Sequence, residues 1–376
     1  MRVGLNATCL NDRPSGAKQR FIGIYGGLIN RLPDVEFVLY EPVDCRVADW
    51  FAGSPNVSAV RTPIPSEGRV GKFVQGLEYW NRALRDERFD LFECFNQPLV
   101  KSPTGRTLTT IHDIRRVYPE WPSFAERLAY RFSLRETLKR VDTAITVSDT
   151  MKAEILAFQP DARVSVIYNG IDLKHFAAST EQEEQFVRSK FGLPDNFLLA
   201  VGHFEPRKNY LRLIDAVALL RDRGHRYNLV VVGNDSGDRR LVEERIASTG
   251  LGAQVTLLSN LSDLEVRYMY KLCGLFVFPS SYEGFGIPIL EAMAMGVPMV
   301  LSDISVFREI TQDAGVYFPH DSKDAMAQAI ETTLASQERM DALVTYGQRR
   351  VQDFSFDRLS AQLVELYKSL MTSQHK

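Results

Sequence analysis

Short apolar runs alternate with longer amphipathic stretches along most of the 376-residue chain. Each run is only a few residues long and rich in Val, Ile, Leu and Phe, which is typical of strands buried on both faces of a parallel sheet. Strands are expected in the first half at Arg2–Asn6, Glu36–Tyr40, Val57–Val60, Phe89–Glu93, Thr107–Ile111, Thr143–Val147 and Val164–Ile167. Their alternation with helical patterns predicts an α/β protein with doubly wound parallel sheets.

Helical patterns between these strands are expected near Lys18–Arg31, Lys72–Arg85, Glu126–Arg140 and Thr150–Phe158. An Asn-Gly turn within Tyr168–Asp172 interrupts the alternation, and Asn-Gly strongly favours a turn. The chain is also too long for one typical hydrophobic core. We therefore expect two domains, residues 1–172 and residues 173–354, and a final amphipathic helix near Phe354–Met371.

The second half repeats the pattern after a charged helix at Glu181–Phe191. Further strands are expected at Phe197–Val201, Leu229–Gly233, Val255–Leu258, Leu275–Phe278 and Val297–Leu301. The clearest unit is Phe276–Asp303, in which a strand, a glycine turn at Glu283–Pro288, a helix and another strand follow in order. A glycine turn before a helix presents free N–H groups and the positive end of the helix dipole, which suit an anion or a ring of hydroxyls.

Two carboxylates accompany this turn. Glu283 lies within it, and Glu291 follows eight positions later in the expected helix, so that both could face one cleft. Carboxylates accept hydrogen bonds well from sugar hydroxyls, which favours a polyhydroxy ligand. The alternative is a surface loop with two solvated glutamates, and the spacing alone leaves both interpretations open.

A second candidate site follows the strand Phe197–Val201, where residues 202–209 have the sequence GHFEPRKN. Arg207 and Lys208 come just before an expected helix. Arg offers a bidentate fork to phosphate and Lys offers a point charge. These cations could simply be solvated, but cations are disfavoured at a helix N-terminus, so their position indicates a compensating anion.

Two polar segments of the first half also follow strands. The loop Asn11–Ala17 contains Gly16 and lacks the P-loop pattern. His112 and Asp113 follow the strand Thr107–Ile111. In open α/β sheets ligands bind at such strand ends, although an ordinary turn and a structural histidine would look the same.

A basic row in the same half has two possible roles. Arg127, Arg131 and Arg135 are spaced by four and therefore form one stripe on a helix. Such a stripe could lie on an anionic membrane. The alternative, which we favour for the apolar side of this helix, is an ordinary amphipathic helix with its apolar residues in the core.

Composition narrows the function classes. The net charge of −2 argues against nucleic-acid binding. The sequence contains neither an Asp-x-Asp motif nor a His, Cys, Asp and Glu cluster with metal-ligand spacing, so no metal cofactor is expected. We expect a cytoplasmic protein, at most peripheral to a membrane, because no signal-peptide segment or long apolar run occurs. The scattered cysteines are expected to be free thiols, at Cys9, Cys45, Cys94 and Cys273.

The segment Glu283–Asp303, EGFGIPILEAMAMGVPMVLSD, resembles the Glu-x7-Glu signature of the retaining GT-B glycosyltransferases of family 4. The segments YNGID and GHFEPRKN and the His112-Asp113 pair resemble other motifs of that family, in the same order. The resemblance implies two Rossmann-like domains with an interdomain cleft. Residues 1–172 would bind the acceptor and residues 173–354 the nucleotide sugar, and a C-terminal helix within 355–376 would pack back on the first domain.

The resemblance also implies roles for single residues around the nucleotide diphosphate. Arg207, Lys208 and the Gly16 amide would contact the diphosphate, and Glu291 would bind the ribose hydroxyls. The donor-binding backbone at Leu261 would read the base. One departure concerns His203, because several branches of the family place an Arg there, and this leaves one phosphate-binding cation in doubt.

The donor sugar would be held by Glu283 and by His112, and His112 is not assigned a general-base role. The resemblance makes these two residues, with Arg207 and Lys208, the expected catalytic residues. The resemblance adds three backbone amides to the donor-sugar contacts, those of Phe285, Gly286 and Ile287. Retention would follow from attack on the face that the diphosphate leaves.

The run HDIRRVYPEWP resembles bacterial transferases that use GDP-mannose or GDP-deoxyhexoses for surface polysaccharides. A GDP-mannose-dependent mannosyltransferase acting on a lipid-linked or oligosaccharide acceptor, such as a lipopolysaccharide intermediate, is therefore the leading expectation, and a UDP-hexose is the second donor. A nucleotide-sugar epimerase and a non-catalytic nucleotide-sugar-binding partner of an assembly complex are the rival classes. The expected partners are the donor and the acceptor, without nucleic acid, and peripheral contact with an anionic membrane is left open as an alternative.

Overall fold

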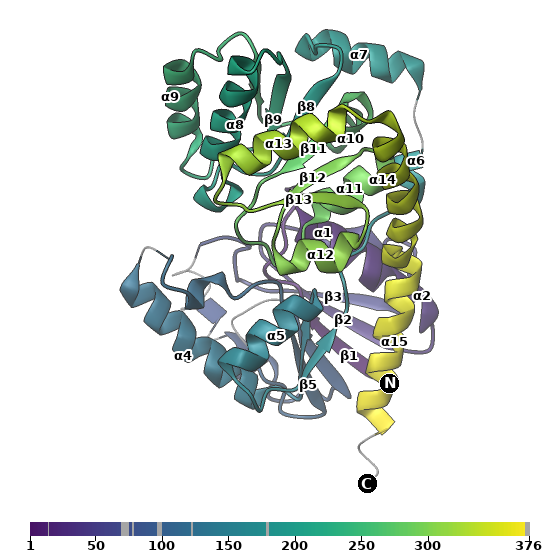
Figure 1. Ribbon diagram of the computed structural model, residues 1–376. Helices are drawn as coiled ribbons and strands as arrows, with labels where there is room; N and C mark the ends of the chain where they lie inside the picture. The colour runs from purple at the N-terminus through teal and green to yellow at the C-terminus, as the bar shows by residue number, and fades with distance from the viewer. Residues whose placement is uncertain are drawn as a thin grey trace. The chain divides into compact units, whose positions relative to one another are not determined.

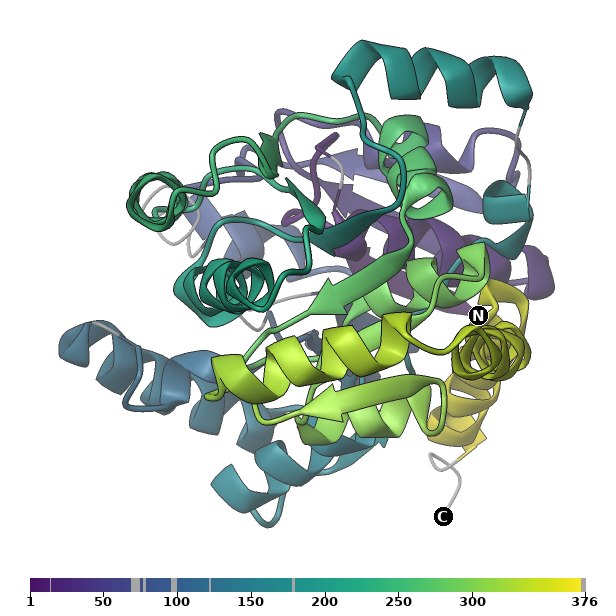
Figure 2. The ribbon, with the colours of Figure 1, turned by 45° about the horizontal axis from the view of Figure 1, so that its top comes forward.

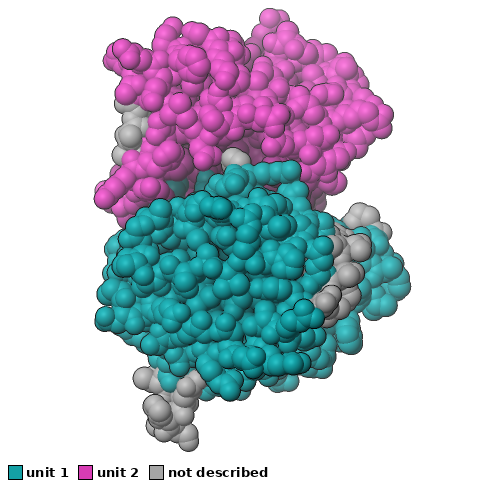
Figure 3. Space-filling model, turned by 180° about the vertical axis from the view of Figure 1, so that it is seen from behind, with its two compact units in different colours: residues 1–171, 356–376 teal, residues 172–355 magenta. Residues whose placement is uncertain are grey.

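The computed structural model describes residues 1–13, 15–68, 75–76, 79–95, 100–121, 123–177 and 180–372. The helix expected at Lys72–Arg85 lies partly outside these residues, and its described part is helical at residues 75–76 and 79–83. The chain divides into two compact units (Figure 3). Unit 1 comprises residues 1–171 and 356–376, and unit 2 comprises residues 172–355.

The sheet of unit 1 is parallel throughout and has the strand order β3-β2-β1-β4-β5-β6-β7. Its strands are β1 (Arg2–Asn6), β2 (Glu36–Glu41), β3 (Val57–Arg61), β4 (Leu91–Cys94), β5 (Arg106–Ile111), β6 (Thr143–Thr146) and β7 (Val164–Val166). The direction of winding reverses between β1 and β4, which makes this the doubly wound topology expected from the sequence.

Helices cover the unit 1 sheet, and the three consecutive segments α1, η1 and α2 form one helix with a π-helical middle. Their bounds are α1 (Gly16–Arg20), η1 (Phe21–Tyr25), α2 (Gly26–Arg31), η2 (Val47–Phe51), η3 (Arg115–Val117), α4 (Phe124–Arg140), α5 (Asp149–Phe158) and α15 (Phe356–Thr372). Figure 1 shows α15 beside α2. Apolar residues of α15, including Leu359 and Leu363, share one core with Phe21, Leu28 and the strand residue Val3.

The sheet of unit 2 is also parallel, in the order β10-β9-β8-β11-β12-β13. Its strands are β8 (Phe197–Val201), β9 (Asn228–Val232), β10 (Val255–Leu258), β11 (Leu275–Phe278), β12 (Met299–Ser302) and β13 (Gly315–Phe318). Winding reverses between β8 and β11, so the loops after these two neighbouring strands emerge side by side.

The helices of unit 2 are α6 (Leu173–Ala177), α7 (Glu181–Phe191), η4 (Pro206–Lys208), α8 (Tyr210–Asp222), α9 (Arg239–Thr249), α10 (Asp263–Leu272), α11 (Ile287–Met295), α12 (Ser305–Thr311), α13 (Lys323–Leu334), α14 (Gln337–Arg350) and η5 (Val351–Phe354). Helices α8, α9 and α13 cover one sheet face, and α8 lies beside α13 in Figures 1 and 2. On the other face Phe276 contacts Tyr270 of α10, and Phe278 stacks on Phe307 of α12.

Most elements expected from the sequence are present, with ends that differ by one or two residues. Side chains at the helix starts explain several boundaries, since Ser262 and Glu265 form a capping box at α10 and Ser148 caps α5. The four cysteines are free, as expected. Among the described residues, no helix combines the length and the apolar character needed to cross a membrane.

The expectation that the apolar side of α4 lies in the core is wrong for part of the helix. Leu134 and Leu138 are buried, but Leu128 is 59% exposed and Phe132 is 70% exposed. The reason is geometrical, because these residues belong to two different rows of the helix and only one row can face the unit.

Candidate functional site

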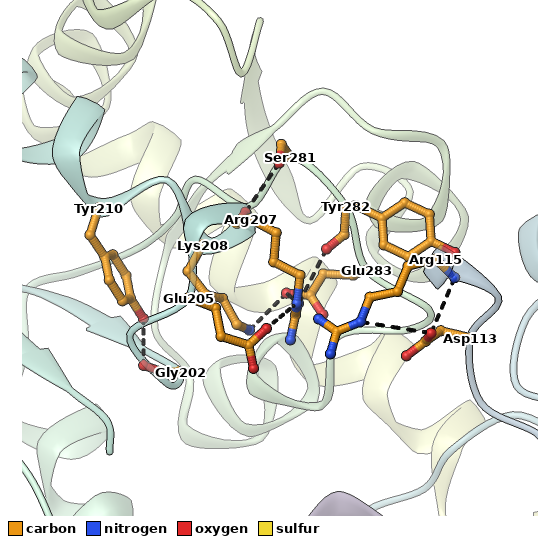
Figure 4. A network of polar contacts seen from close by, with 10 residues as sticks. All are labelled: Asp113, Arg115, Gly202, Glu205, Arg207, Lys208, Tyr210, Ser281, Tyr282 and Glu283. Carbon is orange, nitrogen blue, oxygen red and sulfur yellow. Dashed lines mark hydrogen bonds and ion pairs between the residues drawn. The ribbon is translucent and has the colours of Figure 1, made fainter. Parts of the chain in front are cut away.

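The candidate site of unit 2 lies where the loops after β8 and β11 meet. Because β8 and β11 are neighbouring parallel strands, their carboxyl ends share one edge of the sheet. The Ser281 amide donates to the Arg207 carbonyl at 2.8 Å, and Asn209 Nδ2 donates to the Pro279 carbonyl at 3.1 Å. These bonds join two loops that are distant in sequence, and Figure 4 shows the bond between Ser281 and Arg207.

Glu283 accepts from both cations of the first loop. Its Oε1 lies 2.6 Å from Arg207 Nη1 and 2.7 Å from Lys208 Nζ. Arg207 also donates from Nε to Glu205 at 2.8 Å and from Nη1 to the Tyr282 carbonyl at 3.2 Å. The Lys208 and Glu283 side chains are only 7% and 11% exposed. Two cations and two carboxylates therefore converge in a largely buried group (Figure 4).

Burial and pairing set the protonation states of this group. Burial alone would raise the pKa of Glu283, but Lys208 and Arg207 outweigh it and hold the pKa at about 2. Burial would lower the pKa of Arg207, but Glu283 and Glu205 raise it above its ordinary value. Burial lowers the pKa of Lys208, which Glu283 opposes. Glu283 is consequently an ionised acceptor across the physiological pH range.

Gly202 makes room for the buried ammonium of Lys208. Its φ is +148°, and a Cβ there would lie 2.8 Å from Lys208 Cε and 2.9 Å from Nζ. The ammonium also lies 4.7 Å from the ring centre of Phe278, and Tyr210 donates to the Gly202 carbonyl at 2.8 Å. Only glycine at position 202 leaves Lys208 this place between a strand end and an aromatic ring.

The second loop ends in the start of α11. Gly286, at φ +117°, is its N-cap residue, Pro288 lies in its first turn, and no side chain caps its first amides. Phe285 is buried and packs edge-on against Phe354, with ring centres 5.9 Å apart. The phenylalanine ring therefore anchors the loop, while the Ile287 backbone begins a helix N-terminus beside Glu283.

Glu291 lies later in α11 and has a different partner from Glu283. Tyr270 of α10 donates its hydroxyl to Glu291 Oε2 at 2.8 Å. Burial raises the pKa of Glu291 to about 7, although the Tyr270 bond opposes this shift. The two acids of the motif therefore differ electrostatically, because one is paired with cations and the other with a neutral hydroxyl.

His203 and Leu261 lie on the loops that surround this group. His203 is exposed, and its Nδ1 accepts from the Asn234 amide at 3.3 Å. Leu261 immediately precedes the N-cap residue Ser262 of α10. Among the described residues, no group of His, Cys, Asp and Glu side chains is placed to hold a metal ion.

Gly16 and His112 belong to unit 1. Gly16 is the first residue of α1, directly after the capping Ser15. His112 follows β5, and burial and then the Arg20 charge lower its pKa to about 3, against a backbone hydrogen bond with Phe95. Its Nε2 is buried without a hydrogen-bond partner, so the neutral ring keeps an acceptor free. Beside it, Asp113 accepts from the Arg115 amide at 3.2 Å (Figure 4).

Several polar residues at these positions were not singled out in the sequence. Glu205 stands within GHFEPRKN beside the two cations, so its charge was a usable signal. Tyr270 gave none, because it meets Glu291 from another helix, 21 residues away. In unit 1, Arg20 is buried and donates to the carbonyls of Ile167 and Tyr168 at 2.9 and 2.6 Å.

This fold and this pair of loop motifs define a class of protein. The description "Glycosyltransferase Family 4" matches residues 33–175, and "Glycosyl transferases group 1" matches residues 181–350. The chain therefore belongs to the GT-B glycosyltransferases and is an enzyme of that class, as its motifs predicted. Its two parallel sheets are those of the GT-B fold.

Individual relatives agree with this assignment. The O-antigen chain mannosyltransferase RfbU of Salmonella typhimurium is 31% identical over 265 residues, which are 70% of this chain and 68% of that protein. The O-antigen chain mannosyltransferase B of Escherichia coli is 30% identical over 270 residues, 70% of this chain and 71% of that protein. Among solved structures, a sucrose-phosphate synthase from Thermosynechococcus elongatus superimposes with a TM-score of 0.79 and 21% identity, covering 99% of both chains. That last similarity concerns the fold alone.

Proposed function

We propose that this enzyme transfers mannose from GDP-mannose, with retention of configuration, to a lipid-linked or polysaccharide acceptor of cell-surface glycan synthesis. The observation that carries the proposal is the junction of Arg207, Lys208 and Glu283 at the carboxyl ends of β8 and β11. The names of the two relatives, both O-antigen chain mannosyltransferases, support mannose as the transferred sugar and cell-surface glycan synthesis as the process. A UDP-hexose remains the second candidate donor.

The chemistry follows from where charge develops. Cleavage of the anomeric C–O bond places negative charge on the leaving diphosphate. Arg207 and Lys208 provide positive charge in a largely buried place, where electrostatic stabilisation is stronger than in water. Glu205 and Glu283 already hold the Arg207 and Lys208 side chains in place, so these cations need little reorganisation during the reaction. Fixed cations do here what a metal ion does elsewhere, and we propose that no metal is required.

Without a donor, the two cations are balanced by Glu205 and Glu283. A bound diphosphate would accept hydrogen bonds from Arg207 and Lys208. Glu283 would then direct its free lone pairs to hydroxyls of the donor sugar, since its low pKa keeps it an acceptor. The backbone amides at the start of α11 would contact the same sugar, namely those of Phe285, Gly286 and Ile287.

The remaining assignments rest on the family resemblance and on the chemistry of each group. Glu291 would accept from the ribose hydroxyls, and the backbone at Leu261 would contact the base. The Gly16 amide would approach the diphosphate. The neutral His112 ring, with its unpartnered Nε2, would accept from a hydroxyl of the donor sugar. His203 places an imidazole ring where several family branches carry an arginine.

The first experiment is a thermal-shift panel with GDP, UDP, ADP and dTDP, with and without EDTA. A ligand that binds only the folded protein raises the unfolding midpoint. We expect GDP alone to give a clear shift that EDTA does not change. A shift with UDP alone would replace GDP-mannose by a UDP-hexose as the proposed donor. A shift that is lost in EDTA would contradict metal-free binding. No shift with any of the four nucleotides would contradict the transferase assignment.

Two variants then separate the acids and test the rival functions. Glu291→Ala should chiefly weaken GDP binding, and Glu283→Ala should chiefly lower turnover. Chromatography of the reaction products should show transferred mannose and no epimerised nucleotide sugar. Unchanged surface polysaccharide synthesis in a strain that carries only Lys208→Ala would instead favour a non-catalytic binding partner.

A further inference from the structure

Asn209 combines a left-handed backbone with three side-chain hydrogen bonds. It follows Lys208 in the first loop of the unit 2 site, at φ +59° and ψ +31°. Its Nδ2 donates to the Pro279 carbonyl at 3.1 Å and to the His320 carbonyl at 2.7 Å. Its Oδ1 accepts from Arg212 Nη1 at 3.4 Å. Both amide hydrogens are therefore used on backbone carbonyls, so this side chain serves the protein rather than a ligand.

The two carbonyls belong to segments that are distant in sequence. Pro279 follows β11 directly, and His320 follows β13 in the next loop. Asn209 itself lies in the loop after β8. All three strands belong to one parallel sheet, so their carboxyl ends lie on one edge. One side chain therefore ties together the ends of β8, β11 and β13. We call the two bonds from Asn209 to Pro279 and His320 the Asn209 clamp.

Bonds at the end of β12 complete the connection between β11 and β13. Ser302 donates its hydroxyl to the Ser280 carbonyl. The Asp303 amide donates to the Phe318 carbonyl at 2.7 Å. The carbonyls that the clamp contacts therefore belong to backbone that is already connected across three strands, which gives the side chain a firm attachment.

Asparagine meets two requirements at position 209 that few residues meet together. A positive φ favours Gly, Asn and Asp over the other amino acids. The two carbonyls require two N–H donors on a short side chain, which neither Gly nor Asp provides. A carboxylate would instead place negative charge against two carbonyl oxygens. The residue type is therefore explained by the clamp and not by the turn alone.

The two residues before Asn209 carry the charge of the site. Arg207 Nη1 and Lys208 Nζ lie 2.6 and 2.7 Å from Glu283 Oε1. The Lys208 side chain is only 7% exposed, so its charge is tolerated only while it stays beside Glu283. A displacement of about 1 Å at a catalytic group can cost on the order of a hundredfold in rate. The backbone at position 209 thus has to be fixed if both cations are to stay in place.

We propose that Asn209 is a positioning residue for the glycosyl transfer. Through the clamp it holds Arg207 and Lys208 in the geometry that stabilises the leaving diphosphate, and it does not itself contact the substrate. The proposal rests on the proposed function, because it assumes that these two cations face the diphosphate. The competing explanation is that Asn209 only stabilises the fold.

Three variants test the clamp. Asn209→Gly keeps the positive φ and removes the side chain, and Asn209→Asp keeps the shape but replaces both donors by an oxygen. Asn196→Gly is the matched control. Asn196 also has a positive φ, +48°, but it precedes Phe197 and therefore lies at the opposite end of β8. The turnover number and the KM are measured from GDP release from GDP-mannose, with water as the acceptor, well below the unfolding midpoint of each variant.

We expect Asn209→Gly to lower the turnover number by about tenfold or more, with a smaller change in KM because the cations remain on the loop. Asn209→Asp should lose at least as much, and Asn196→Gly should keep the turnover of the wild type. A purely structural role would lower the unfolding midpoint and leave the turnover number unchanged. Equal turnover in Asn209→Gly and Asn196→Gly would therefore overturn the proposal.

A second readout does not depend on the donor. Acetylation with a water-soluble N-hydroxysuccinimide ester, followed by mass spectrometry, measures how well Lys208 is protected. Lys190 is 47% exposed and is the internal standard. We expect Lys208 to be acetylated several-fold faster in Asn209→Gly than in the wild type and in Asn196→Gly. Equal rates in the three proteins would show that the clamp does not hold the lysine, and would also overturn the proposal.

The two readouts separate the clamp from the proposed function. Faster acetylation of Lys208 in Asn209→Gly, in a protein whose wild type shows neither a GDP shift nor GDP release, would remove the proposed donor and leave the clamp standing. GDP release by the wild type with equal turnover and equal acetylation in Asn209→Gly would remove the clamp and leave the transferase.

Discussion

Single residues decide the chemistry of the unit 2 site through burial and pairing. Lys208 and Glu283 are among the least exposed charged side chains. Their ion pair offsets the free-energy cost of burying each charge. The same burial acts on Glu291 without a cation beside it, and there it raises the pKa to about 7. Two acids of one motif thus acquire different properties from their neighbours.

Lys208→Met should lower the turnover number by about 10²–10³-fold, since it removes one fixed cation from the leaving diphosphate. Arg207 still balances Glu283, so the variant should fold, which thermal unfolding can verify. Lys190→Met is a suitable control, because Lys190 also pairs with a glutamate, Glu265, in the same unit. The expected outcome is a loss of turnover for Lys208→Met alone, and equal turnover in both variants would contradict it.

The affinity for GDP should depend on the ionisation of Glu291. A carboxyl with a pKa of about 7 gains its charge as the pH rises, so ribose hydroxyls find a better acceptor above that value. Calorimetric titration should therefore show affinity rising about tenfold between about pH 6 and pH 8 because of this group. Glu291→Gln provides the baseline, since the diphosphate also titrates in this range. Parallel pH profiles for the two proteins would refute the assignment.

At the scale of elements, the site depends on where short strands and helices stop. Four-residue strands such as β11 end at one edge, and the loops that follow carry the charged groups. The sequence-predicted start of α11 was two residues late, because Pro288 and the glycine before it allow the helix to begin at Ile287. This places the first amides of the helix next to Glu283.

Gly286→Ala should destabilise the protein by more than about 1 kcal/mol, because the backbone is at a positive φ that alanine disfavours. The added Cβ would also lie 3.2 Å from Ile289 Cδ1 and from Phe307 Cε1. Gly237→Ala separates the two effects, since Gly237 has φ +112° and no heavy atom within 4 Å of the added carbon. We expect a larger fall in unfolding midpoint for Gly286→Ala, together with weaker donor binding. Equal effects would mean that packing at the start of α11 is unimportant.

At the scale of the whole molecule, the C-terminal helix α15 belongs to unit 1 although it follows unit 2 in sequence. Its apolar face joins the core of unit 1, and its Tyr367 donates to the buried Glu93 of β4 at 2.6 Å. Glu93 also accepts from Tyr25 and from Thr110. Burial raises the pKa of Glu93 despite these bonds, so the carboxyl depends on its donors.

Tyr367→Phe should lower the unfolding free energy by about 1–3 kcal/mol, because it leaves a buried carboxyl oxygen without its donor. The measurement is the thermal unfolding midpoint, with limited proteolysis to detect release of α15. Tyr346→Phe is the control, since its hydroxyl bonds Gln312 at the surface. A Tyr367→Phe protein as stable as this control would show that Glu93 does not hold the helix.

The amino-acid sequence by itself determined the parallel α/β architecture, the glycine turn before α11 and the chemical identity of Arg207, Lys208, Glu283 and Glu291. It could do so because strand length, helical period and turn preference are local properties. The family resemblance rested on the same local motifs.

Only the tertiary structure decided which charges neutralise one another. Lys208 and Glu283 are 75 residues apart, and Tyr367 and Glu93 are 274 residues apart. It also decided which row of α4 faces solvent, since two apolar rows competed for one buried side. A pKa depends on desolvation and on partners from distant segments, so the values of about 2 for Glu283 and about 7 for Glu291 arise only when the chain is folded.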